Sequence, residues 1–331
     1  TAPIESALEL PCYVAGEPVV GNSKLEVHYP YTGEVSGIVS MLGRKELDAA
    51  ISAALAPRDP LTRYQRYEIL ERARTLLSER ADEFAHLIRS EAGLCMRETR
   101  YEVGRAQDVL QFAAMESLKD DGQIFSCDVS PQGKARKIFT IREPLDLVAA
   151  ITPFNHPLNQ VAHKLAPAIA AGVPVILKPA KKTPLTAIRF VELLYEAGLP
   201  GPMLSVLLGT VDELLDPLVA DERVNLVTFT GSTRIGKQLP KTAGYKKLCL
   251  ELGGNAPLII MDDAEMDLAV TLAAEGCFRN SGQRCTAVKR LLVHEKILAE
   301  FTERFVEKVK EYPAGDPADE ATRVGTVIDE P

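Results

Sequence analysis

The stretch after Pro144 alternates short apolar runs with helical patterns, and this alternation limits the fold more than any other feature of the sequence. Strands separated by helices form a mostly parallel sheet with helices on its faces, so we predict an α/β fold. Thr183 is expected to be the N-cap of the helix predicted over 185–197, and Pro184 to be its first residue. The predicted strands are 147–151, 173–177, 204–207, 224–229, 247–250 and 257–260, and the predicted helices are 157–170, 185–197 and 235–243.

The first 144 residues have a different pattern. From 44 to about 115, apolar residues recur three and four positions apart with charges between them, which is typical of amphipathic helices. Residues 122–144 are rich in turn residues around a short β-branched and aromatic run, which indicates the strands of a small protruding sheet. The length of 331 residues favours two or three domains.

Charge and composition exclude several classes of protein. The net charge of -8 argues against a nucleic-acid partner or a membrane surface, because both require a positive field. The longest uncharged apolar stretch, 165–177, contains Pro and Gly and is shorter than the ~18 residues of a membrane span. Residues 1–12 lack the pattern of a signal peptide, so a cytoplasmic protein is expected. The six cysteines lack metal-site spacing, so no metal is expected.

Cys285 is the candidate nucleophile. Gly282 allows close approach of a ligand, and the positive charge of Arg284 favours the reactive thiolate. On these neighbours alone, an ordinary packed cysteine in a turn explains the sequence better.

Two further polar residues follow predicted strands. Glu251 precedes two glycines and is placed to act as a general base, although a solvated loop carboxylate is the alternative. Asn155 can donate its amide to a developing oxyanion, although an asparagine turn before Pro157 is also common.

Two segments point to a phosphate-bearing cofactor. Lys178 ends a strand and can reach ribose or phosphate oxygens. Gly231 and Ser232 lie at a strand-to-helix turn, where backbone N–H groups are available to phosphate.

Together these segments occur in the order asparagine, lysine, glycine-serine, glutamate, cysteine, and they resemble the signature segments of the aldehyde dehydrogenase superfamily. The resemblance implies Cys285 as nucleophile, Glu251 as the base for deacylation, and Asn155 with the Cys285 N–H as oxyanion hole. In this chemistry a thiohemiacetal expels hydride to the nicotinamide and water hydrolyses the resulting thioester. The resemblance also implies cofactor contacts from Thr152, Pro153, Phe154, Lys178, Ala180, Lys181, Gly231, Ser232, Ile235, Leu252 and Gly253.

The implied fold is the aldehyde dehydrogenase fold. It has a Rossmann-like nucleotide-binding domain (1–121 and 145–253), a small oligomerisation sheet (122–144) and an α/β catalytic domain (254–331). A homodimer or tetramer is expected from the small sheet. Family members continue beyond the segments matched here, so the chain is expected to be C-terminally incomplete.

The cofactor expected from the resemblance is NAD, with NADP as the alternative. Many NAD-using members have a glutamate that binds the adenosine ribose where this chain has Lys181. A carboxylate there would repel a ribose 2′-phosphate, whereas lysine would not.

The expected substrate is a small anionic aldehyde. Residues 282–290 are similar to members that oxidise phosphorylated or hydroxylated aldehydes, and phosphonoacetaldehyde is preferred over glyceraldehyde 3-phosphate, lactaldehyde and succinate semialdehyde. The predicted substrate contacts are Arg105, His156, Arg284 and Thr286, with the first three forming a cradle for the anion. The alternative is that both arginines make structural ion pairs and His156 caps a helix.

Two other functions remain as alternatives. Transfer of the thioester to coenzyme A would be a different reaction on the same fold, and the presence of Glu251 favours hydrolysis. A catalytically silent structural protein would be a different class, although such relatives tend to lose the nucleophile or the cofactor residues.

Overall fold

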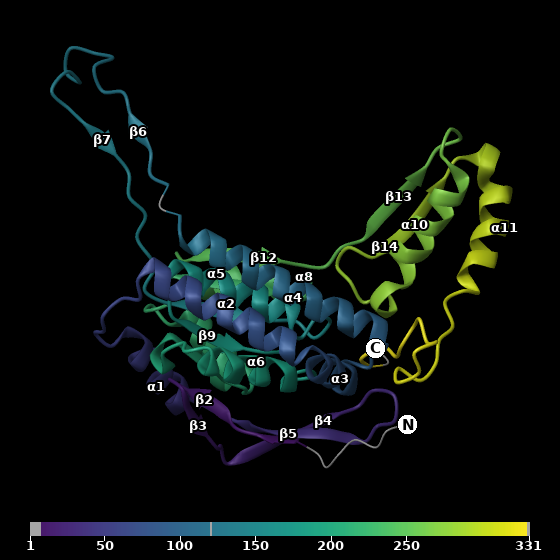
Figure 1. The fold of residues 1–331 in the computed structure, drawn as a ribbon, viewed down its shortest axis with the longest axis horizontal. Coiled ribbons are helices and arrows are strands. Elements are labelled where there is room, and N and C mark those ends of the chain that lie inside the picture. Colours follow the sequence, from purple (N-terminus) through teal and green to yellow (C-terminus); the bar gives the residue numbers. More distant parts are fainter. Residues whose placement is uncertain (1–7, 120, 330–331) are drawn as a thin grey trace.

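The computed structural model describes residues 8–119 and 121–329, so residues 1–7, part of the stretch expected to lack a signal-peptide pattern, lie outside it. Helices and a central sheet form the larger part of the molecule, and a hairpin and a smaller lobe extend from it (Figure 1). Within the described ranges, no helix combines the length and the apolar character needed to cross a membrane.

The central sheet has seven strands in the order β12-β11-β8-β9-β10-β2-β3. The five strands from β8 to β12 are parallel, which confirms the predicted α/β fold. Each predicted strand is present within a few residues of its expected place: β8 (Val148–Ile151), β9 (Val175–Lys178), β10 (Leu204–Val206), β11 (Leu226–Thr230) and β12 (Lys247–Glu251).

Helices α5 (Asn159–Ala171) and α6 (Leu185–Glu196) connect the first three of these strands, and α7 (Asp216–Ala220) precedes β11. The predicted helix at 235–243 is two short helices, α8 (Thr233–Gly236) and α9 (Leu239–Ala243). Pro240 lies in the first turn of α9, where a backbone N–H would have no partner within the helix. In the interior of one continuous helix from α8 to α9, the same proline would remove a hydrogen bond and clash with the preceding turn.

The capping of α6 differs from the prediction. Pro184 is the N-cap, and Thr183 instead donates its hydroxyl to the carbonyl of Phe154 at 3.3 Å. The carboxylate of Glu91 accepts from the backbone N–H groups of Leu185 and Thr186, at 2.7 and 3.0 Å. The cap therefore comes from a distant helix, which no local pattern reveals.

The predicted N-terminal helices are confirmed as α1 (Arg44–Leu55), α2 (Arg63–Glu79), α3 (Ala81–Ala92) and α4 (Met96–Ser117). Helices α2, α3 and α4 pack against one another and against α5 and α6. The predicted protruding strands are β6 (Ile124–Phe125) and β7 (Ile138–Phe139), which pair antiparallel in a long hairpin (Figure 1).

Five strands before α1 were missed by the sequence analysis. β2 and β3 extend the central sheet in antiparallel direction, whereas β1, β5 and β4 form a separate sheet. The alternation of apolar Leu25 and Val27 with polar residues was the available signal for β4. The strands are β1 (Leu8–Leu10), β2 (Cys12–Val14), β3 (Glu17–Val19), β4 (Ser23–His28) and β5 (Val35–Met41).

The smaller lobe has a separate apolar core that includes Ile260, Val270, Ala273 and Phe301. The predicted strand at 257–260 is β13 in this lobe, and it pairs with β14 in parallel. The stretch after α11 returns to the larger part of the molecule, where Thr326 donates its N–H to the carbonyl of Gly93 at 2.9 Å. The elements of the lobe are β13 (Ala256–Ile260), α10 (Met266–Phe278), β14 (Val288–Val293) and α11 (Leu298–Val309).

Candidate active site

The predicted site segments meet at the carboxyl edge of the parallel strands. Thr152 follows β8 and donates its N–H to the carbonyl of Lys178, the last residue of β9, at 3.2 Å. Gly231 follows β11 and donates to the carbonyl of Glu251, the last residue of β12, at 3.0 Å. The strand order reverses between β8 and β11, and ligands of open α/β sheets bind outside the strand ends at such a point.

The edge residues fit a dinucleotide cofactor. Lys178 is 8% exposed, and burial, followed by the nearby charge of Lys181, lowers the pKa of its ammonium to about 8. The hydroxyl of Thr230 is buried and has no hydrogen-bond partner among the described residues. A cation and an unpartnered hydroxyl at the sheet edge are suitable donors for ribose and phosphate oxygens.

The turn after β11 and the loop after β12 are in close contact. Ser232 caps α8 by accepting from the N–H of Ile235 at 3.3 Å. A methyl group at Gly236 would lie 2.2 Å from Leu252 Cδ2, and one at Gly253 would lie 3.3 Å from Thr233 Oγ1. The residues predicted to contact the cofactor in these two segments therefore share one small region. After β9, Ala180 and Lys181 lie at the start of the turn that leads to α6.

Cys285 is exposed and lies between α10 and β14. A methyl group at Gly254 would lie only 2.4 Å from the carbonyl oxygen of Cys285. The chain can approach this closely because position 254 has no side chain. The segment that carries Cys285 is therefore packed against the loop that begins at Glu251, which is also exposed. Thr286, predicted to contact the substrate, follows as an exposed residue.

Asn155 connects the loop after β8 to the segment that carries Cys285. Its Nδ2 donates to the carbonyl of Gln283 at 2.7 Å, and its own carbonyl accepts from Nδ2 of Asn280 at 3.1 Å. The structure thus brings the predicted oxyanion donor beside the segment that carries Cys285. An amide donor, a thiol and a carboxylate on adjacent segments are the groups needed for acyl transfer through a covalent intermediate.

The predicted anion cradle is not assembled by direct contacts. The guanidinium of Arg284 donates to the carbonyls of Glu275 and Gly276, at 3.2 and 2.9 Å, near the end of α10. Arg105 lies on α4, 3.5 Å from Asp108. Arg105 therefore makes an ion pair of the kind expected in the alternative, whereas Arg284 binds backbone carbonyls instead of a carboxylate.

His156 likewise has a structural partner. Its Nδ1 is 3.4 Å from the Glu102 carboxylate, which also accepts from the N–H groups of Leu158 and Asn159 at the start of α5. The role of these residues in substrate binding stays a prediction.

Two basic residues of α5 were missed by the sequence analysis. Burial lowers the pKa of Lys164 to about 8, and the nearby Cys249 and Glu251 oppose this shift. Its Nζ donates to Thr228 at 2.9 Å. Burial also lowers the pKa of His163, as do the charges of Arg105, Lys164 and His156. His163 follows His156 by seven residues, but His156 precedes α5, so this spacing does not place the two side chains on one helical face.

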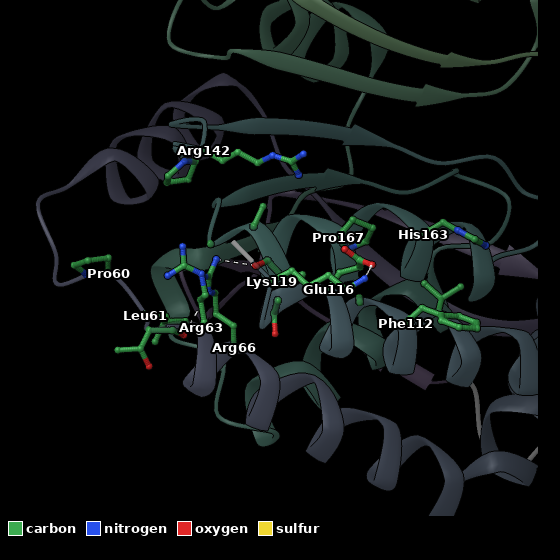
Figure 2. A pocket seen from close by; sticks show the side chains of 18 of the residues that line it. Pro60, Leu61, Arg63, Arg66, Phe112, Glu116, Lys119, Arg142, His163 and Pro167 are labelled. Carbon is green, nitrogen blue, oxygen red and sulfur yellow. Dashed lines mark hydrogen bonds and ion pairs between the residues drawn. The ribbon is translucent and has the colours of Figure 1, made fainter. Parts of the chain in front are cut away.

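A cavity of about 730 Å³ lies among α2, α4 and α5, next to the root of the hairpin (Figure 2). Phe112 and His163 lie at one end of it, and Pro60 and Leu61 lie at the other (Figure 2). Arg105 also lines it, but the described residues that form its wall do not include Asn155, Glu251 or Cys285.

Comparison with known proteins gives a consistent family match. The family model described as the aldehyde dehydrogenase family matches residues 19–331. The 3-sulfolactaldehyde dehydrogenase of Priestia aryabhattai is 40% identical over 317 residues, which cover 96% of this chain and 66% of that protein. The mitochondrial succinate-semialdehyde dehydrogenase of Arabidopsis thaliana is 38% identical, and the match covers 93% of this chain and 59% of that protein. The chain thus spans less than two thirds of the length of these relatives.

Solved structures agree with this match. Aldehyde dehydrogenase 21 from Physcomitrella patens, in complex with the reaction product succinate, is 37% identical and superimposes with a TM-score of 0.94. The match covers 98% of this chain and 69% of that one. By sequence, by fold and by the residues at the edge of its parallel sheet, the chain belongs to the aldehyde dehydrogenase family.

Proposed function

We propose that the protein oxidises a small anionic aldehyde to the carboxylate, with NAD or NADP as cofactor. The observation that carries the proposal is the hydrogen bond from Asn155 Nδ2 to the carbonyl of Gln283, at 2.7 Å. This hydrogen bond holds the Asn155 amide beside the segment of Cys285, the residue whose sulfur would bond to the aldehyde carbon. Family membership supports the reaction type.

The chemistry begins at Cys285. Its sulfur attacks the aldehyde carbon, a C–S bond forms, and the carbonyl electron pair moves to the oxygen. The second N–H of the Asn155 amide and the backbone N–H of Cys285 donate to that oxyanion. When bound, the nicotinamide supplies the hydride acceptor that turns the adduct into a thioester.

Glu251 acts in the second half of the reaction. Its carboxylate takes a proton from water, and the resulting hydroxide attacks the thioester carbon. The C–S bond breaks, the Cys285 thiolate is regenerated, and the carboxylate product leaves.

A single-turnover experiment tests the two roles. In Glu251→Gln the thioester should form but not hydrolyse, so reduced cofactor should appear as one equivalent per site and then stop. Cys285→Ser should give no such burst, whereas Cys127→Ser, a control on the hairpin, should turn over normally. Continuous turnover by Cys285→Ser would refute the proposal, as would a strict requirement for coenzyme A.

For the substrate we propose phosphonoacetaldehyde first. Two relatives are named for aldehydes with an anionic group, a sulfonate in one and a carboxylate in the other. Phosphonate and sulfonate share a tetrahedral shape with three oxygens, so one set of cationic donors can bind either. Initial rates with phosphonoacetaldehyde, 3-sulfolactaldehyde, succinate semialdehyde, lactaldehyde and glyceraldehyde 3-phosphate, each with NAD and NADP, rank the candidates.

We propose that Arg105, His156 and His163 bind the anion: the Arg105 guanidinium supplies the positive charge, and His163, whose lowered pKa favours the neutral imidazole, supplies a ring N–H donor. The effect of Arg105 and His156 on the pKa of His163 supports their proximity. Arg284 is left out because its guanidinium is occupied by backbone carbonyls.

Substitution of Arg105 tests this assignment. Arg105→Leu should raise KM for the anionic aldehyde on the order of tenfold, the effect of losing one charged hydrogen bond, and leave KM for propanal unchanged. Arg284→Leu is the matched control, because it also removes one arginine near the site, and it should change KM for the anionic aldehyde and for propanal by the same factor. An equal change for the two aldehydes in Arg105→Leu would contradict the role of Arg105.

A further inference from the structure

The backbone just before Cys285 has an unusual conformation. Asn280, Ser281 and Gly282 have φ values of 56°, 53° and 70°, all in the left-handed region. This region costs a non-glycine residue about 1–2 kcal/mol, although asparagine tolerates it better than most residues. Such a backbone persists where surrounding contacts hold it in place.

Three hydrogen bonds form a closed ring around this segment. Asn280 Nδ2 donates to the carbonyl of Asn155 at 3.1 Å. The N–H of Gln283 donates to the carbonyl of Asn280 at 3.0 Å. Asn155 Nδ2 donates to the carbonyl of Gln283 at 2.7 Å. The ring therefore joins the loop after β8 to the segment that carries Cys285, which is 125 positions away in the sequence.

The side chain of Asn280 is 1% exposed, so it makes this bond in a site from which water is excluded. A donor removed from such a site is not replaced by solvent, and the acceptor is left without a partner. The bond from Asn280 is also the part of the ring that depends on a side chain outside the proposed oxyanion hole.

We propose that Asn280 is a positioning residue for the oxyanion hole. Asn280 fixes the main chain of Asn155, while the carbonyl of Gln283 fixes the orientation of the Asn155 amide. One amide N–H is used in the ring, which leaves the other to donate to the substrate oxygen. This inference rests on the proposed function, because it assigns a role within that reaction.

A simpler role for Asn280 would be to tolerate the left-handed turn. Asn280→Gly separates the two roles, because glycine adopts the same φ but cannot donate to Asn155. Asn280→Asp keeps the size of the side chain and loses the Nδ2 donor. Ser281→Gly is the matched control: Ser281 is also left-handed, and its hydroxyl has no hydrogen-bond partner within the part of the chain that the structure describes.

The experiment measures kcat and KM of the purified protein with its best aldehyde, and thermal unfolding of each variant. Asn280→Gly and Asn280→Asp should lower kcat about 100-fold, the loss expected from a misplaced catalytic group, and change KM less than about threefold. Ser281→Gly should keep the kcat of the parent protein.

A double-mutant cycle completes the test. In an Asn155→Ala background, Asn280→Gly should cause little further loss of kcat, because the two residues act as one unit. If Asn280→Gly lowers kcat by the same factor in the parent protein and in Asn155→Ala, the inference is overturned. Unchanged kcat in Asn280→Gly would also overturn it. If the parent protein oxidises none of the aldehydes, the proposed function fails and this inference fails with it. If the parent is active and Asn280→Gly is equally active, the inference alone fails.

Discussion

Lys178 illustrates how the fold sets the chemistry of a single residue. The sequence identifies it as a strand-end lysine, but its charge depends on burial and on Lys181 beside it. With a pKa near 8, the ammonium is charged at neutral pH and loses its proton as the pH rises through this value. Its attraction for an anionic dinucleotide should be lost over the same range.

This gives a pH-dependent prediction for cofactor binding. The Kd for NAD should be constant below pH 7 and rise as the pH passes about 8, which binding titrations at several pH values can follow. Lys178→Met should bind more weakly and without that rise. Lys247→Met, at the opposite end of β12, is the control and should behave as the parent. The assignment is wrong if Lys178→Met keeps the same pH dependence.

Glu102 acts at the scale of helices. It lies on α4, yet its carboxylate accepts from two backbone N–H groups at the start of α5, at 2.8 and 3.0 Å. Glu91 on α3 does the same for α6. Because a helix N-terminus carries unpaired donors and a partial positive charge, a buried carboxylate is a favourable partner for it. The Glu102 contact fixes α5, which follows the loop of Asn155, and the Glu91 contact fixes α6, which follows Lys178.

Glu102→Leu should therefore destabilise the protein by about 2–4 kcal/mol, since two buried donors lose their acceptor. Glu102→Gln should cost about 1 kcal/mol, because its amide oxygen can still accept. Urea unfolding measures both. Glu116→Leu, an exposed position on the same helix, is the matched control and should have little effect. Similar losses in Glu102→Leu and Glu116→Leu would argue against the capping role.

At the scale of elements, the strands and helices with a clear repeat were predictable, because periodicity is a local property of the sequence. The division of the helix at 235–243 and the capping of α6 were not predicted correctly. In the second case the cap comes from Glu91, which is 94 positions from the N–H that it binds.

The hairpin is the feature that matters for the whole molecule. It extends away from the central sheet (Figure 1), and its apolar side chains are exposed, including Ile124 at 90% and Phe139 at 69%. A two-stranded ribbon has little stability by itself, and exposed apolar patches often mark association surfaces. The oligomerisation role expected from the family resemblance remains a prediction.

Substitution of the hairpin tests that role. Phe139→Glu combined with Ile141→Glu should shift the protein to a smaller species in analytical ultracentrifugation, because charges there oppose burial in an interface. Val20→Glu, an exposed apolar residue near the N-terminal strands, is the control and should leave the mass unchanged. An unchanged mass in the hairpin variant would show that the hairpin does not hold the assembly together.

The sequence by itself determined the parallel sheet and placed Asn155, Lys178, Gly231 and Glu251 at the ends of its strands. Alternating strands and helices are local signals, and the carboxyl ends of parallel strands necessarily share one edge. The tertiary structure decided which groups meet across long separations: Asn155 with the segment before Cys285, Glu102 with α5, and Arg284 with the end of α10. These contacts depend on how side chains pack between elements, and no repeat or spacing in the sequence encodes that packing.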